Sequence, residues 1–249
     1  MALRERIKWL LFPGSNLHAR LRYRTLPRFF RTASDHEPRD VLDAGCGNGM
    51  LSYASYRKGN RVLGLSIKDS EVARCRTLFN GCLRIPTDRL TFEVRNLYTL
   101  GDLNMQFDEI ICSEVLEHLS RDRDVCFSFW NILKPGGTLH LCCPNADHPD
   151  NLNGPLDLNE TGGHVRPGYT LATYKALLEP IGFRIVQSVG ISGPIRQAFN
   201  KRIIRIEERF GAVPGFLLSW VALLFVWLDP AAPRVPYSIY VRAVKGDVS

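Results

Sequence analysis

The sequence lacks the cysteine pairs that would indicate a zinc site or a disulfide framework. None of its seven cysteines has the C-x-x-C spacing, and an odd total leaves at least one unpaired. We therefore expect free thiols in a reducing compartment. The apolar run 9–12 is too short for the core of a signal peptide, so a cytoplasmic location is expected.

Acidic residues are also in the minority. Lys and Arg number 32 against 25 Asp and Glu, which gives a formal net charge of +7. The basic excess lies before residue 40 and again between residues 196 and 209. Such a charge can favour nucleic acid, anionic lipid or anionic small molecules. Segment 18–31 mixes arginine with aromatics but has no folded RNA-binding signature, so no nucleic-acid partner is expected.

Between residues 39 and 190, short β-rich apolar runs alternate with helix-like stretches. This alternation predicts an α/β fold with a mostly parallel sheet covered on both faces. Helices are expected to begin near Gly49, Ser70, Arg121 and Thr170. Strands are expected over 41–44, 61–66, 90–94, 107–113, 137–143 and 183–189, with a last strand within 237–245.

The chain divides into four predicted parts. Residues 1–38 form a basic helical lead-in, 39–190 a core domain, 191–236 a helical insertion, and 237–249 the final strand and tail. The lead-in is interpreted as a helical cover over the cofactor or acceptor site, with binding to an anionic surface as the other interpretation.

A glycine-rich turn follows the first predicted strand in the stretch VLDAGCGNGM, residues 41–50. Glycines at a strand-to-helix turn permit positive φ and let a ligand approach the backbone. The dinucleotide pattern G-x-G-x-x-G/A fails because Met50 occupies its last position, whereas G-x-G-x-G holds from Gly45 to Gly49. Asp43 disfavours a nearby pyrophosphate and suits a cationic ligand group.

The pattern D-x-G-x-G-x-G resembles motif I of class I S-adenosylmethionine-dependent methyltransferases. Three further stretches resemble the ubiquinone-methyltransferase-like branch (methyltransferase type 11/12 like): FDEIICSEVLEHL (107–119), LKPGGTLHLCCPN (133–145) and YKALLEPIGFRIVQ (174–187). The resemblance therefore spans roughly residues 39–190. The resemblance implies a Rossmann-like fold, a seven-stranded and mostly parallel sheet with an antiparallel last strand, and S-adenosylmethionine as cofactor.

The resemblance also implies which residues surround the cofactor. Two positions depart from the family pattern: Ser66 stands where an acidic residue usually holds the ribose, and Asn96 where Asp is common. Both side chains can still form hydrogen bonds, with Lys68 or Asp69 nearby to help. The implied cofactor-binding residues are Asp43, Gly45, Cys46, Gly47 and Gly49 at the amino-acid end, Ser66 at the ribose, Asn96 and Leu97 at the adenine, and Ser113 and Glu114 beside them.

Methyl transfer to oxygen requires a group that removes a proton from the acceptor. Glu117 and His118 follow the fourth predicted strand, and His118 would share a helical face with Glu114 if this stretch is helical. The sequence also suggests His164 as the base, on the loop 159–170. Either histidine could instead have a purely structural role.

The loop 159–170 contains two further features. Arg166 is a candidate contact for an anionic acceptor group, and the glycines at 162 and 163 would let the loop move as a lid. The other interpretation is a solvated loop whose His and Arg cap the next helix. No metal site is expected, because Cys142 and Cys143 are neighbours on a strand and point to opposite faces.

The insertion combines a basic amphipathic helix with an apolar segment. Apolar residues from Ile195 to Phe210 recur at helical spacing among arginines, and Pro214 and Gly215 are expected to end this helix. The following run 216–228, with Trp220 and Trp227, is shorter than the roughly 20 residues that span a bilayer. It could pack on the core, form a homodimer interface, or make a peripheral membrane contact through 195–228.

The favoured function at this point is S-adenosylmethionine-dependent methylation of a small or lipid-like acceptor, more often at oxygen than at carbon or nitrogen. A cofactor-binding protein without catalysis is the alternative that Ser66 and Asn96 leave open. A nucleic-acid methyltransferase is disfavoured because the fourth strand is followed by SEVL rather than an N/D-P-P-Y-type motif.

Overall fold

The computed structural model describes residues 17–33, 37–225, 228–230 and 233–246. These residues form one seven-stranded sheet in the order β3-β2-β1-β4-β5-β7-β6. The last strand β7 runs antiparallel to both β5 and β6, and the neighbouring pairs from β3 to β5 are parallel. The strands are β1 (Asp40–Ala44), β2 (Arg61–Ser66), β3 (Leu90–Val94), β4 (Phe107–Ser113), β5 (Leu133–Pro144), β6 (Phe183–Ile191) and β7 (Ser238–Lys245). The predicted sheet is confirmed.

Helices follow the strands where the sequence predicts them. Gly49 precedes the first core helix, and the Thr170 side chain caps another by accepting a hydrogen bond from the Thr173 backbone N–H at 3.1 Å. The α-helices up to β6 are α2 (Leu17–Thr25), α3 (Met50–Tyr56), α4 (Asp69–Cys75), α5 (Asp122–Ile132), α6 (Pro149–Leu152) and α7 (Leu171–Leu178). Shorter 3₁₀ or π segments are η1 (Leu26–Arg28), η2 (Arg76–Cys82), η3 (Leu97–Asp102), η4 (Leu116–His118) and η5 (Glu179–Ile181).

Alternation along the strands divides the core between the two faces of the sheet. Leu42 and Ala44 belong to a cluster built with α5 and α7, whereas Val41 belongs to one built with η1, α3 and α4. Cys142 and Cys143 likewise fall in different clusters, which confirms that they point to opposite faces. Both faces are therefore buried, as parallel sheets require.

Strand β5 begins earlier than predicted, at Leu133 rather than at residue 137. Leu133 pairs with Phe107, and the next pair joins Thr138 to Glu109. The intervening segment 134–137 forms an irregularity that Gly136 permits with φ of 68°. The expected turn is therefore present, as an interruption within the strand.

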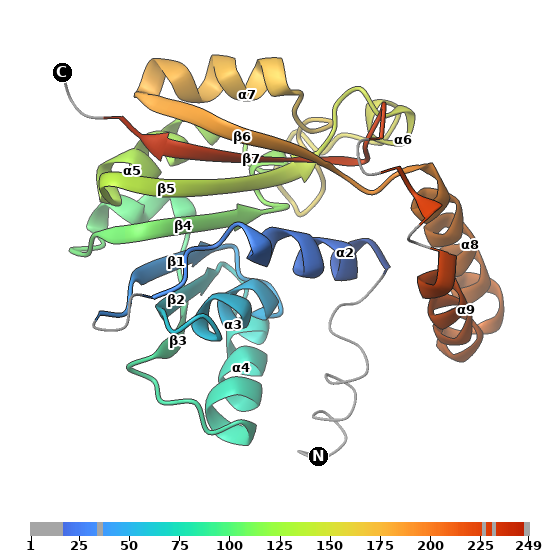
Figure 1. Cartoon of the computed structure of the whole chain (residues 1–249), viewed down its shortest axis with the longest axis horizontal. Helices are drawn as coiled ribbons and strands as arrows, with labels where there is room; N and C mark the ends of the chain where they lie inside the picture. The colour runs from blue at the N-terminus through green and yellow to red at the C-terminus, as the bar shows by residue number, and fades with distance from the viewer. Residues whose placement is uncertain (1–16, 34–36, 226–227, 231–232, 247–249) are drawn as a thin grey trace.

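The insertion before β7 folds as two helices that lie against each other, α8 (Pro194–Phe210) and α9 (Ala212–Phe225). They project beyond the carboxyl edge of the sheet, at the right of Figure 1. The break lies at Gly211, not at Pro214 and Gly215 as predicted, because proline is tolerated in the first turn of α9. No helix in the described ranges is long and apolar enough to cross a membrane. Trp227 and residues 1–16 of the lead-in lie outside the described residues.

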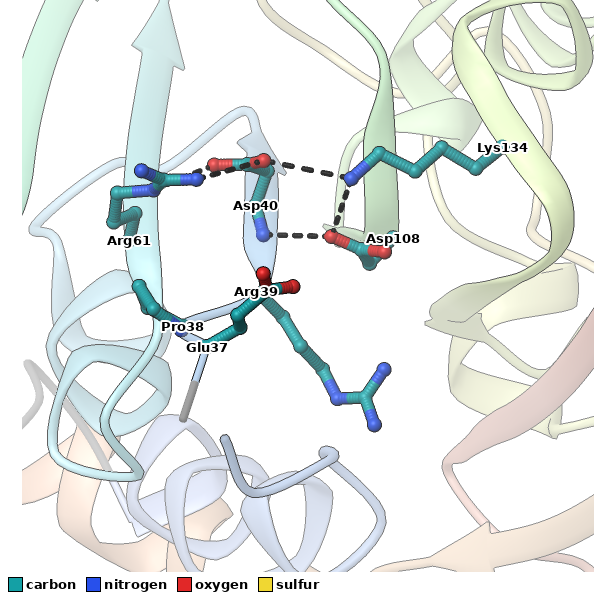
Figure 2. Close-up of a pocket in the computed structure, with 7 residues that line it drawn as sticks. All are labelled: Glu37, Pro38, Arg39, Asp40, Arg61, Asp108 and Lys134. Carbon is teal, nitrogen blue, oxygen red and sulfur yellow. Dashed lines mark hydrogen bonds and ion pairs between the residues drawn. The ribbon is translucent and has the colours of Figure 1, made fainter. Parts of the chain in front are cut away.

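A polar pocket of about 310 Å³ lies at the amino ends of the parallel strands (Figure 2). There Asp40 accepts from Arg61 at 2.8 Å and from Lys134 Nζ at 3.5 Å, and Lys134 also donates to Asp108 at 2.8 Å. These charges compensate one another and tie β1, β2, β4 and β5 together. This edge is opposite the glycine-rich turn, so the pocket is not part of the site described below.

Candidate functional site

The glycine-rich turn is held against the end of β2. The backbone N–H groups of Gly45 and Cys46 donate to the Leu65 carbonyl at 2.9 and 2.7 Å. Gly45 has φ of 84°, and a Cβ there would lie 2.3 Å from Val115 Cγ2, so only glycine fits. A Cβ on Gly47 would meet no atom within 4 Å, because this residue faces open space. The turn thus offers bare backbone to a ligand.

A cavity of about 320 Å³ opens beside this turn at the carboxyl edge of the sheet. Its size is at the lower end of typical ligand pockets. Its lining includes seven of the predicted site residues: Gly45, Gly47, Ser66, Asn96, Leu97, Glu114 and His118. The other predicted residues do not line it: Asp43, Cys46, Gly49, Ser113, Glu117 and His164.

Asp43 lies behind the turn, fully surrounded by protein. Its carboxylate accepts a hydrogen bond from Ser52 Oγ of α3 at 2.5 Å. Burial raises the pKa of Asp43 to about 6, although the Ser52 hydroxyl partly counteracts this rise. In this structure Asp43 therefore supports the turn from beneath.

A carboxylate that the sequence did not single out lies beside Ser66, at the position where the ribose is expected. Ser66 Oγ donates to Glu71 Oε2 at 2.7 Å, and Glu71 lines the cavity from the first turn of α4. The Lys68 backbone N–H donates back to Ser66 Oγ at 3.1 Å. Glu71 is thus the carboxylate in contact with Ser66, and Lys68, which also lines the cavity, lies with its Nζ 3.8 Å from Glu71 Oε1. The place of Glu71 at the start of the helix after β2 is the sequence signal that could have revealed it.

The expected adenine subsite lies at the start of η3. Asn96 Oδ1 accepts from the Tyr98 backbone N–H at 3.0 Å, which fixes this side chain as the cap of η3. Leu97 is almost buried and Ile67 is exposed, and both contribute apolar surface to the cavity.

Helix α2 of the lead-in reaches the site from the side of β6 and α8. Arg22 Nη1 contacts Glu114 Oε2 at 2.9 Å, and Tyr23 Oη donates to Asn48 of the glycine-rich turn at 3.0 Å. Burial raises the pKa of Glu114, and the charge of Arg22 opposes that rise. Through these two contacts α2 is joined to Glu114 and to the glycine-rich turn.

A cluster forms from Glu117, His118 and His164, in which one side-chain N or O atom of each residue lies within 4.8 Å of the other two. Of these three residues, His118 alone lines the cavity. Glu117 is fully buried, and its pKa is raised to about 8 by burial and then by the charge of Glu114. His118 Nε2 lies 4.0 Å from Glu117 Oε1, and the ring centroids of the two histidines are 4.7 Å apart. The predicted helical face shared by Glu114 and His118 is wrong, because Glu114 has φ of 57° and only Leu116–His118 forms a helical turn.

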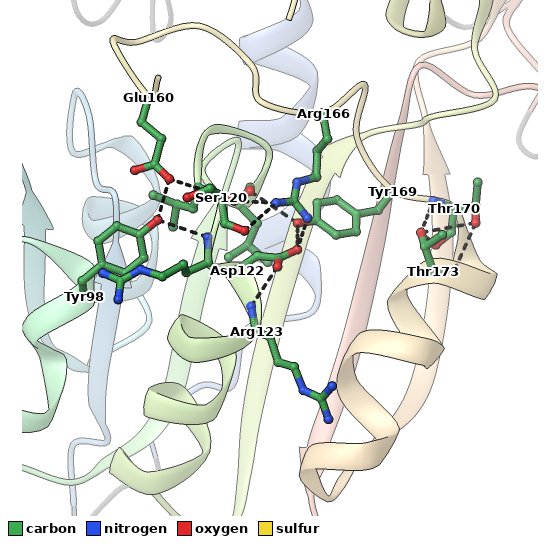
Figure 3. A network of polar contacts seen from close by, with 12 residues as sticks. Tyr98, Ser120, Asp122, Arg123, Glu160, Arg166, Tyr169, Thr170 and Thr173 are labelled. Carbon is green, nitrogen blue, oxygen red and sulfur yellow. Dashed lines mark hydrogen bonds and ion pairs between the residues drawn. The ribbon is translucent and has the colours of Figure 1, made fainter. Parts of the chain in front are cut away.

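The loop that carries His164 is fastened at both ends (Figure 3). Near its start, Glu160 accepts from Tyr98 Oη at 2.8 Å and from the Ser120 backbone N–H at 2.5 Å. Near its end, Arg166 pairs with Asp122 and donates to the Leu119 carbonyl at 2.7 Å. Arg166 therefore anchors the loop, and it is not among the residues that line the cavity.

Residues 15–188 match the family model described as a methyltransferase domain. The chain belongs to the methyltransferase domain family. The chain is 26% identical over 177 residues to the mitochondrial ubiquinone biosynthesis O-methyltransferase of Rattus norvegicus, covering 65% of this chain and 50% of that protein. It is 30% identical over 131 residues to the ubiquinone biosynthesis O-methyltransferase of Idiomarina loihiensis, covering 51% of each. The chain thus spans about half the length of these curated relatives.

Solved structures show the same fold. Phosphoethanolamine N-methyltransferase 2 of Haemonchus contortus, in complex with S-adenosyl-L-methionine, matches with a TM-score of 0.64 at 17% identity, covering 99% of this chain and 58% of that one. Magnesium protoporphyrin IX methyltransferase of Synechocystis, with S-adenosylmethionine bound, matches with a TM-score of 0.53 at 17% identity, covering 85% and 72%. The predicted family and fold are confirmed, with S-adenosylmethionine as the family's cofactor.

Proposed function

We propose that this protein transfers a methyl group from S-adenosylmethionine to a hydroxyl oxygen of a small or lipid-like acceptor. The observation that carries the proposal is the cavity at the carboxyl edge of the sheet, where bare glycine backbone, the carboxylates of Glu71 and Glu114, and apolar surface converge. Parallel α/β sheets bind ligands at this edge. Family membership and O-methyltransferase relatives support both the reaction and the oxygen acceptor.

The lining residues match the chemistry of the cofactor part by part. Gly45 and Gly47 would accept its amino-acid end, Ser66 and Glu71 would hold the ribose hydroxyls, and Leu97 would pack on the adenine. Glu114, which pairs with Arg22, would lie near the cationic sulfur. When bound, S-adenosylmethionine supplies a methyl group on positively charged sulfur, which an acceptor oxygen displaces in line.

The chain itself must position the acceptor and take up its proton. The cluster of Glu117, His118 and His164 is the proposed place of proton uptake, because His118 lies on the wall of the cavity. Burial lowers the pKa of His164, and the neighbouring His118 lowers it further, which favours the neutral imidazole. A neutral imidazole is able to accept a proton.

The α8–α9 pair favours an acceptor that resides at a membrane surface. Apolar side chains stand exposed along both helices: Ile204, Phe210, Val213, Leu217, Trp220, Val221, Leu224 and Phe225. Arg202, Arg205 and Arg209 share α8 with some of them. Exposed apolar surface beside basic residues is the pattern of peripheral contact with anionic lipid.

A cavity of about 530 Å³ lies at the base of this helix pair, and its lining carries further positive charge. It is lined by Arg24, Arg28 and Arg196 and by a single carboxylate, Asp229, which pairs with Arg196 at 3.0 Å. Three guanidinium groups around one carboxylate leave a net positive pocket, which supports binding to an anionic surface.

Cofactor binding is tested by calorimetry with S-adenosylmethionine and S-adenosylhomocysteine. Glu71→Ala should weaken binding at least about tenfold, since it removes a charge-assisted hydrogen bond. Asp69→Ala, on the same helical turn, is the matched control and should bind as the native protein does. If the native protein binds neither compound, the enzyme proposal has to be withdrawn.

Turnover is tested by mass spectrometry of acceptor pools that contain phenolic quinone precursors and lipids. Methylation of a hydroxyl is expected, with activity reduced in His164→Ala while cofactor binding is retained. Cofactor binding without turnover on any pool would favour the non-catalytic alternative.

Membrane contact is tested by flotation with vesicles containing anionic phosphatidylglycerol. The native protein should float, and the double variant Leu217→Glu/Leu224→Glu should not. Leu158→Glu, at an exposed position remote from this surface in sequence, is the control. Flotation of the double variant at the native level would remove the membrane part of the proposal.

A further inference from the structure

The cavity of about 530 Å³ at the base of the α8–α9 pair is separate from the cavity beside the glycine-rich turn. No described residue lines both of them. Its walls come from segments far apart in the chain: the end of α2 with η1, the end of β6, the start of α8, and the residues around Asp229 before β7. A volume of this size is typical of small-molecule sites. The second cavity can therefore hold a ligand of its own.

Three arginines from distant segments converge on this cavity. Arg24 lies in the last turn of α2 and Arg28 in η1, while Arg196 lies in the first turn of α8. Burial lowers the pKa of Arg196, the carboxylate of Asp229 opposes this shift, and the charges of Arg24 and Arg28 add to it. The three guanidinium groups are therefore close enough to repel one another.

Asp229 is the only acidic residue among the described residues that line the cavity, and its charge is already used. Its side chain is only 2% exposed, and the carboxylate accepts hydrogen bonds from the backbone N–H groups of Ile195 and Arg196 at 2.8 and 3.2 Å. It also pairs with Arg196 Nε at 3.0 Å. These contacts cap the amino end of α8 and neutralise Arg196. The positive charges of Arg24 and Arg28 are left uncompensated.

Arg24 and Arg28 have the chemistry of a phosphate site. Both residues are exposed, and neither makes a hydrogen bond or an ion pair with another residue in the described part of the chain. A guanidinium group presents a planar set of N–H donors that matches two oxygens of a phosphate. A phosphomonoester carries a charge of about −1.5 to −2 at neutral pH, which would offset both arginines.

The rest of the lining favours an organic phosphate over a free phosphate ion. Thr25 and Ser192 carry hydroxyl groups, which can donate to phosphate oxygens. Ser192 also has φ of 69°, a conformation that is unfavourable for a residue with a side chain and that recurs at ligand sites. Apolar residues form the remaining wall: Phe29, Val189, Ile191, Pro230 and Pro233. Such a wall suits the organic group that a phosphate ester carries.

We propose that this cavity binds the phosphate group of a phosphate ester, with Arg24 and Arg28 on the phosphate oxygens. Arg196 completes the positive wall, and the organic group of the ester packs on the apolar residues. The site goes beyond the proposed methyl transfer, because it takes a second ligand at a place that the cofactor does not reach. Either a lipid headgroup or a soluble phosphate ester can supply this chemistry. The exposed apolar side chains of the adjoining α8 and α9 favour the lipid.

Binding is measured by calorimetry on the full chain with two probes, glycerol 3-phosphate and dihexanoyl phosphatidic acid below its micellar concentration. One bound molecule per chain is expected. Arg28→Gln should weaken binding at least about tenfold, because a charge-assisted hydrogen bond is lost. Arg184→Gln removes an exposed arginine of β6 outside the cavity, so this matched control should bind as the native protein does.

The two probes distinguish the sources of the phosphate. Tighter binding of phosphatidic acid than of glycerol 3-phosphate would assign the site to a lipid headgroup. Equal or weaker binding of the lipid would assign it to a soluble phosphate ester. Two outcomes would overturn the proposal: no saturable binding of either probe at millimolar concentration, or native affinity in Arg28→Gln. The thermal midpoint of this variant checks that the fold is kept.

Calorimetry of the native protein with S-adenosylmethionine separates this inference from the proposed function. Binding of S-adenosylmethionine without binding of either phosphate ester would refute the second site alone. Binding of a phosphate ester without binding of S-adenosylmethionine would refute the methyltransferase proposal alone.

Discussion

Replacing Asp43 by asparagine should stabilise the cofactor-free protein at neutral pH. Burial raises the pKa of Asp43 from an ordinary value of 3.8 to about 6, because the ionised carboxylate is poorly solvated beneath the glycine-rich turn. Between these two pH values the folded state holds a proton that the unfolded state has released. The free energy of unfolding therefore falls as pH rises from about 4 to about 6, and the full penalty applies above that window.

The size of this effect follows from the shift in pKa. About two pH units at roughly 1.4 kcal/mol each amount to about 3 kcal/mol at pH 7.5, and to about 1 kcal/mol at pH 4.5. Asparagine cannot ionise, and its carbonyl oxygen can still accept the hydrogen bond from Ser52. Asp43→Asn should thus gain up to about 3 kcal/mol in stability at pH 7.5.

Urea unfolding of both proteins at pH 4.5 and 7.5 measures the difference. The exposed substitution Asp88→Asn is the control and should change stability equally at both pH values. A gain for Asp43→Asn that is the same at both pH values, or a loss that grows with pH, would refute the reasoning. The same substitution should weaken S-adenosylmethionine binding if the carboxylate charge serves the cofactor.

Other buried groups yield further predictions. Glu109→Ala should destabilise the protein by about 3–5 kcal/mol in urea unfolding, because buried His140 would lose the carboxylate that lies 2.5 Å from its Nε2. A loss of stability below about 1 kcal/mol would contradict this. Gly168→Ala should lower the thermal midpoint or prevent folding, since its Cβ would lie 1.9 Å from a main-chain oxygen of β5 at φ of 122°; an unchanged midpoint would show that the loop adjusts. Arg22→Met should shift the pH dependence of cofactor binding to higher pH, because the guanidinium charge opposes the rise in the pKa of Glu114. Calorimetry between pH 5.5 and 8 measures this shift. An unchanged pH dependence would show that α2 only covers the site.

Local patterns in the sequence were sufficient to predict the sheet and the glycine-rich turn. β-rich apolar runs at strand length identified the strands because both faces of this sheet are buried, and the observed bounds of β2, β3 and β4 equal the predicted ones. The turn was predictable because Gly45 must take a positive φ that few other residues accept. The backbone conformation of a strand or a turn depends on a few consecutive residues, so the sequence alone predicts it.

Features that depend on contacts between distant segments were decided only by the tertiary structure. Arg166 looked available to a ligand until the fold placed Asp122 against it, and Glu71 looked like an ordinary helix residue until it met Ser66 at the cavity. His164 joins Glu117 because a loop after β5 returns to the end of β4, although 47 residues separate them in the chain. Side-chain partners of this kind depend on the packing of whole elements, which periodicity and turn chemistry do not specify.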